Sequence, residues 1–199
     1  MAHAIDTHNT ADQRIRSLLR QLIRQQDGSF LPLPRALIKS CMASYDIHLL
    51  GAVNSVLDMP DHVGRISPTL DIRSILTFKM HYCERCLTED PKSAWADSRY
   101  TAGWDFAAWF LNHYHKGSFQ TPDLMPIKKW LKTFFLTSDP QVRICLIRTI
   151  LAEILRERKI RLFFEDWEKD PDLHKAMQSA LSEKSIRAYA LHVSKPAWR

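Results

Sequence analysis

The residues of this chain that come closest to a chemical motif are Cys83-Glu-Arg-Cys86. Two cysteines at this spacing, joined by imidazoles, supply the ligands that zinc favours in structural sites. His113 and His115 lie further along the chain and are candidate imidazole ligands. The spacing therefore raises two possibilities for this pair, a metal site or redox chemistry.

The surroundings of the pair favour a different interpretation. Cys83 continues an apolar helical stripe that holds Leu76, Met80 and Leu87. A free cysteine at a core position acts as a small apolar side chain, and a thioredoxin-type pair needs a neighbouring β-sheet. We therefore predict reduced thiols and no cofactor, and keep as weaker metal candidates Cys83, Cys86, His113 and His115.

Two further groups of polar residues have types that could support catalysis. The stretch 112–116, Asn-His-Tyr-His-Lys, ends a predicted helix, where cationic side chains suit the helix dipole. A cluster of carboxylates of the kind used in acid–base chemistry follows later: Glu165, Asp166, Glu168, Asp170 and Asp172. The sequence contains no Glu-x-x-His, His-Glu-x-x-His, Gly-x-Ser-x-Gly or phosphate-loop motif. Since no convergent catalytic site is visible, we predict that the protein is not an enzyme.

Basic residues lie in two sets. The first is an arginine row opposite an apolar helical stripe: Arg14, Arg16, Arg20 and Arg24. The second set is Lys128, Lys129 and Lys132, continued by Arg156, Arg158, Lys159 and Arg161. Such rows bind phosphates in some proteins, and they are also typical of the solvated face of an amphipathic helix. The formal charge of +6 favours an acidic partner, either a protein or a nucleic acid.

Apolar periodicity predicts an all-α fold built around a central helix pair. Ile127, Trp130, Leu131, Phe134 and Phe135 follow the spacing of one helix face. The next helix starts at Asp139-Pro140, a cap followed by a proline suited to the first helical position. Its apolar residues form so broad an arc that we expect it to be covered on more than one side: Ile144, Ile147, Ile150, Leu151, Ile154 and Leu155.

About eight helices in a single bundle or irregular stack of hairpins are expected. We predict a disordered tail over 1–9, one domain over 10–193 with a possible sub-boundary at 88–97, and a frayed end over 194–199. The expected helices cover about 10–27, 37–42, 46–57, 70–87, 98–116, 124–137, 140–157, 171–182 and 183–192. No apolar run approaches the roughly 18 residues of a membrane span, and the N-terminus lacks the form of a signal peptide. We therefore expect a cytoplasmic protein.

The block from Tyr100 to Leu181 resembles the small all-α immunity proteins of bacterial toxin systems. The residues that carry this resemblance are Tyr100, Trp104, Trp109, Ile127, Trp130, Asp139, Val142, Leu151, Glu153, Leu155, Trp167 and Leu173. The resemblance implies a stack of helical hairpins that binds and blocks a cognate toxin. We accordingly expect a non-catalytic protein-binding module, an immunity or inhibitor protein, whose partner has an acidic surface. The alternative is a nucleic-acid-binding accessory protein that uses its basic helix faces.

Overall fold

The computed structural model describes residues 12–17, 35–58, 72–88 and 96–182, and every regular element in these ranges is helical, which confirms the all-α prediction. The chain forms two compact units, Met1–Arg85 and Cys86–Arg199. This division falls just before the sub-boundary predicted at 88–97. The predicted tails at 1–9 and 194–199, the loop before residue 70 and the helix over 183–192 lie outside the described residues.

The first unit consists of a helical segment over 12–17, α2 (Arg35–Ala43), α3 (Ile47–Asp58) and most of α5 (Ile72–Thr88). The positions of α2, α3 and α5 match the predicted helices to within two residues, because their apolar periodicity is regular. The core of this unit is made by one apolar stripe from each helix, including Ile15, Cys41, Leu50, Val53 and Phe78.

Polar contacts fix the start of α3 in the first unit. Asp46 accepts hydrogen bonds from the backbone N–H groups of His48 and Leu49, both at 3.1 Å, and so caps the helix. The Ser44 hydroxyl donates to Asp12 at 2.6 Å, which ties the segment 12–17 to the loop before α3. At the other end of α3, the exposed Asp58 pairs with Lys79, whose side chain is only 5% exposed.

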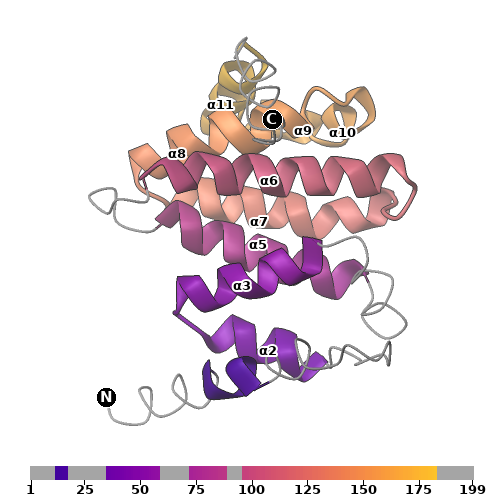
Figure 1. Cartoon of the computed structure of the whole chain (residues 1–199). Helices are drawn as coiled ribbons and strands as arrows, with labels where there is room; N and C mark the ends of the chain where they lie inside the picture. The colour runs from indigo at the N-terminus through magenta and orange to yellow at the C-terminus, as the bar shows by residue number, and fades with distance from the viewer. Residues whose placement is uncertain (1–11, 18–34, 59–71, 89–95, 183–199) are drawn as a thin grey trace, which may run out of the picture. The chain divides into compact units, whose positions relative to one another are not determined.

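The second unit contains the longer run of helices (Figure 1). In chain order these are α6 (Ala96–His115), the 3₁₀ turn η1 (Thr121–Asp123), α7 (Leu124–Thr137), α8 (Pro140–Leu146), the π-helical turn η2 (Ile147–Leu151), α9 (Ala152–Ile154), α10 (Arg158–Phe163), the 3₁₀ turn η3 (Glu165–Lys169) and α11 (Pro171–Ser182).

The segment from α8 to α9 is the central element of this unit, as predicted. Ile150, Leu151, Ile154 and Leu155 are completely buried, since the segment packs against α6 and against α11. Asp139 caps its start by accepting from the N–H groups of Gln141 and Val142. Ile144 differs from the prediction, because it is 40% exposed and lies outside the buried arc.

The central segment is not the single regular helix that its periodicity predicts. It opens into a π-helical turn over Ile147–Leu151, where the Thr149 hydroxyl donates to the carbonyl of Cys145 at 2.7 Å. Thr149 also lies so close to Gly103 of α6 that a Cβ on that glycine would be 2.2 Å from the Thr149 Oγ1. The absence of a side chain at position 103 therefore allows α6 to approach the turn.

Two aromatic residues of α6 belong to the core of the second unit. Phe106 and Phe110 are buried, and the Phe106 ring lies 5.1 Å from that of Trp130 on α7. Periodicity does not separate core filling from a self-association face for Phe106, Trp109 and Phe110, and the structure buries the two phenylalanines. Their burial establishes that they fill the core.

Candidate functional site

α10 is a short helix of the second unit that leaves most of its side chains exposed. Between Arg158 and Phe163 only Ile160 is buried. The helix begins at Glu157, whose carboxylate accepts a hydrogen bond from the backbone N–H of Lys159 at 3.4 Å. Its C-terminal end leads to Phe164 and Trp167, which are both buried with their ring centroids 4.8 Å apart. α10 is thus fixed at both ends while its middle faces outward.

Lys128 of α7 is the main link between the central helices and α10. Its ammonium donates to the carbonyl of Phe163 at 2.8 Å and pairs with Asp166. It also lies over the Phe163 ring, 4.7 Å from the centroid. The sequence predicted Lys128 as a binding residue, but its side chain is only 14% exposed. Lys128 therefore holds α10 in place and is not available to a partner.

The cations next to this link remain available. Five exposed basic side chains make no ion pair or side-chain hydrogen bond within the described part of the chain: Lys129 and Lys132 of α7, and Arg158, Lys159 and Arg161 of α10. Leu162 lies beside Arg161 and is 51% exposed. We refer to Arg158, Arg161 and Leu162 together as the α10 surface.

The other predicted binding residues have different surroundings. Arg156 pairs with Glu153 at 3.2 Å, within one turn of its own segment. In the first unit, Arg16 pairs with Asp46 at 2.8 Å. Arg20 and Arg24 lie outside the described residues. Of the predicted set, the structure therefore leaves Lys129, Lys132 and Arg158 as exposed side chains without an ion pair among the described residues.

Two members of the acidic cluster have structural roles. Asp166 pairs with Lys128, and Asp170 caps α11 by accepting from the N–H groups of Asp172 and Leu173. Glu165 and Glu168 are exposed. They lie directly after α10, so a negative patch follows the positive one along the chain.

The cysteines are buried free thiols, as the sequence predicted. Burial raises the pKa of Cys41 to about 12, so this thiol stays protonated at physiological pH. Over the described ranges, no group of three or more His, Cys, Asp or Glu side chains is arranged to hold a metal ion. His113 packs against Trp109, with 4.8 Å between ring centroids, and is thus part of an aromatic cluster.

A pocket lies beside the start of α10, and the turn that follows α6 forms one side of it. α6 ends with Gly117 in the left-handed region, at φ +75°, where a residue without Cβ is favoured. The N–H of Gly117 donates to Tyr114 and that of Ser118 to His113, which reverses the chain direction. Phe119 is then buried against Phe110, with 5.4 Å between ring centroids. This reversal leaves Tyr114 and His115 facing the segment that precedes α10.

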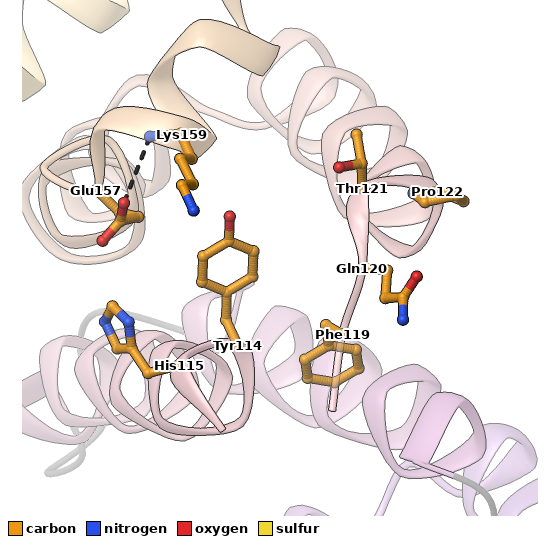
Figure 2. A pocket seen from close by; sticks show the side chains of 8 residues that line it. All are labelled: Tyr114, His115, Phe119, Gln120, Thr121, Pro122, Glu157 and Lys159. Atoms are coloured by element: carbon orange, nitrogen blue, oxygen red, sulfur yellow. Dashed lines mark hydrogen bonds between the residues drawn. The ribbon is translucent and has the colours of Figure 1, made fainter. Parts of the chain in front are cut away.

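The pocket has a volume of about 440 Å³. It is lined by Tyr114, His115, Phe119, Gln120, Thr121, Pro122, Glu157 and Lys159. Figure 2 shows the Tyr114 hydroxyl and the Lys159 ammonium extending into the same space, with His115 below Glu157. The Thr121 hydroxyl faces them from the other side of the pocket. Hydroxyl, ammonium and carboxylate groups therefore share one cavity beside the α10 surface.

Sequence reasoning missed this pocket and the exposure of Leu162. Tyr114 and Lys159 are far apart in the chain, and only the turn at Gly117 and the fold of the second unit bring them together. Leu162 carried a local signal, since it is a large apolar residue that directly follows a run of basic residues. The basic positions Arg158, Lys159 and Arg161 were visible in the sequence, but their lack of internal partners was not.

Comparison with known protein families, characterised proteins and solved structures finds no match for this chain. Among the described helices, none has the length and apolar character needed to cross a lipid bilayer. The geometry of α10 and its surroundings is accordingly the basis for the function proposed below.

Proposed function

We propose that this protein is a non-catalytic binding module whose α10 surface docks on an acidic patch of another protein. The observation that carries the proposal is the combination of a fixed helix and unpaired cations. α10 is held by Lys128 and by Phe164, yet Arg158 and Arg161 are exposed and make no ion pair among the described residues. A helix that is already held in place loses little conformational entropy on binding. Its exposed guanidinium groups can donate paired hydrogen bonds to the carboxylates of a partner.

A protein partner fits this surface better than a nucleic acid does. Leu162 is an exposed apolar side chain next to Arg161, and a protein partner can bury it in the apolar core of an interface. The exposed Glu165 and Glu168 follow closely. They would repel a phosphate backbone, whereas a protein partner can place a basic residue opposite them.

The proposal includes an inhibitor or immunity role, in keeping with the expectation from the block Tyr100–Leu181. A blocking protein needs surface complementarity to its target and no catalytic group of its own. The free, buried thiols support a reducing compartment. We therefore extend the proposal to a cytoplasmic protein.

The experiment is affinity capture from a lysate of the source cells with three forms of the full chain. These are the wild type, the double variant Arg158→Glu/Arg161→Glu, and a matched control, Arg14→Glu/Lys39→Glu. The control also reverses two exposed charges that lack ion pairs among the described residues, but these lie in the first unit. Each capture is washed at physiological salt and at about 0.5 M salt, where surface electrostatics are strongly screened.

We expect one stoichiometric protein on the wild type and on the control, and its loss on the α10 variant. With the purified partner, the two charge reversals should weaken Kd by about 100-fold or more, which corresponds to about 1.4 kcal/mol per tenfold step. Equal capture by the α10 variant and the control would overturn the proposal. If nucleic acid is captured at physiological salt and lost at the higher salt, the result would instead favour the alternative function of a nucleic-acid-binding accessory protein.

A further inference from the structure

We infer that the pocket between Tyr114 and Lys159 receives a carboxylate side chain of the acidic partner. This inference rests on the proposed function and adds a specific subsite to it. The pocket adjoins the α10 surface, because Lys159 and Leu162 lie one turn apart in the same helix. A partner that docks on Arg158 and Arg161 would bring its acidic side chains to the mouth of this pocket.

The donors in the pocket match the two oxygens of a carboxylate. Neither the Lys159 ammonium nor the Tyr114 hydroxyl has a hydrogen-bond partner among the described residues. Both extend into the cavity, as Figure 2 shows. A carboxylate can accept from an ammonium with one oxygen and from a hydroxyl with the other, and bonds to charged groups are the stronger kind.

Glu157 makes the pocket selective for a singly charged group. Its carboxylate lines the cavity, and it is held there because it accepts from the backbone N–H of Lys159. The charges of Glu157 and Lys159 largely offset each other for any anion, so the lining supplies no net attraction that repays the larger desolvation cost of a phosphate dianion. The charge of the lining therefore favours a glutamate or aspartate side chain over a phosphate.

The size of the pocket fits a side chain and not only a small ion. A volume of about 440 Å³ exceeds that of a carboxylate group. The apolar stem of a glutamate can lie along the Tyr114 and Phe119 rings, which form one wall. Thr121 offers a further hydroxyl on the opposite side.

The inference is tested by NMR titration of the full chain with four probes. Two are the capped peptides acetyl-Gly-Glu-Gly-amide and acetyl-Gly-Gln-Gly-amide, which differ only in the carboxylate. The third is glutarate, a free small acid, and the fourth is inorganic phosphate. The resonances of Tyr114, Lys159 and Thr121 report on the pocket. Lys159→Gln and Tyr114→Phe remove one donor each, and Lys169→Gln is the matched control because Lys169 is exposed outside the pocket.

We expect saturable shifts with the glutamate peptide and none with the glutamine peptide. Lys159→Gln should weaken binding by about tenfold and Tyr114→Phe by about three- to tenfold, while Lys169→Gln should leave it unchanged. The inference is overturned if the glutamate peptide gives no saturable shift or if Lys159→Gln has no effect. Tighter binding of phosphate would refute the selectivity for carboxylate, and tighter binding of glutarate would identify a free acid as the ligand.

The failure of this inference can be told apart from the failure of the proposed function. The double variant Arg158→Gln/Arg161→Gln removes the two guanidinium groups, adds no negative charge and keeps both pocket donors, so the peptide titration on that variant reports on the pocket. Peptide binding without a captured protein would retain the pocket and reject the docking function. Partner capture that is lost on the α10 variant, without any peptide binding, would retain the docking function and reject the subsite.

Discussion

The helix over 12–17 and α10 carry similar basic residues, but Arg16 of the first helix and the two arginines of α10 have different surroundings. Arg16 pairs with Asp46, which also caps α3, whereas Arg158 and Arg161 pair with no residue in the described ranges. Both helices look like basic faces in the sequence. The difference shows that a basic face in the sequence does not reveal whether the fold supplies a counter-charge.

The same contrast occurs within a single turn of α7. Lys128 bonds to Phe163 and Asp166, and its neighbour Lys129 is exposed. Adjacent residues of a helix point about 100° apart, so one lysine faces α10 while the next faces solvent.

Asp58→Ala should have the largest effect, because it removes the counter-charge of the buried Lys79 in the first unit. Lys79 is 5% exposed and Asp58 is 43% exposed, so we expect a loss of about 2 kcal/mol, below the full penalty for a wholly buried pair. Urea unfolding followed by circular dichroism measures it.

The tryptophans provide a reference for that experiment. All six lie after Cys86, so their fluorescence reports on the second unit. The control Glu168→Ala removes an exposed carboxylate and should change stability by less than about 0.5 kcal/mol. If the unfolding curve of Asp58→Ala coincides with that of the wild type, the ion pair between Asp58 and Lys79 does not contribute to the stability of the first unit.

Lys128→Ala should destabilise the second unit by about 1–2 kcal/mol, since it removes a hydrogen bond from a charged donor and a cation–π contact. Lys129→Ala is the matched control and should change stability by less than about 0.5 kcal/mol. Tryptophan fluorescence during urea unfolding measures both. Hydrogen exchange should also become faster over 158–169 in Lys128→Ala alone. Equal effects of the two variants would remove the distinction between the paired and the unpaired lysine.

His81 should give the smallest effect, a dependence of stability on pH. Burial lowers the pKa of His81 below its ordinary value of 6.5, and the nearby Arg85 guanidinium adds to this lowering. As the pH falls through 6.5, the unfolded chain takes up a proton that the folded chain still excludes. The contribution is therefore fully present above pH 6.5 and is lost as the pH falls through the lowered pKa.

The measurement is the free energy of unfolding at a series of pH values for the wild type and for His81→Gln. The glutamine variant should lose part of the pH dependence, and His174→Gln, which changes an exposed histidine, should retain it. A wild type and a His81→Gln variant with parallel pH profiles would contradict the assignment.

The sequence by itself determined the fold class and most helix positions. Asp139-Pro140 marked the start of α8 because a cap and a proline act locally. The stripes of α5 and α7 were readable because a helix that buries one face must repeat its apolar residues every three to four positions. Burial of Cys83 followed from the same periodicity, whereas Cys86 lies outside the predicted stripe and is buried as well.

Only the tertiary structure decided which polar groups are available. The pairing of Arg16 with Asp46, of Lys128 with Asp166 and of Lys79 with Asp58 joins residues that are far apart in the chain. The π-helical turn over Ile147–Leu151 and the pocket at Tyr114 and Lys159 also depend on contacts between different helices. Helical periodicity indicates which face of a helix is buried, but not which residues of other helices lie opposite its charged side chains. Those residues determine whether a charge has a counter-charge within the protein.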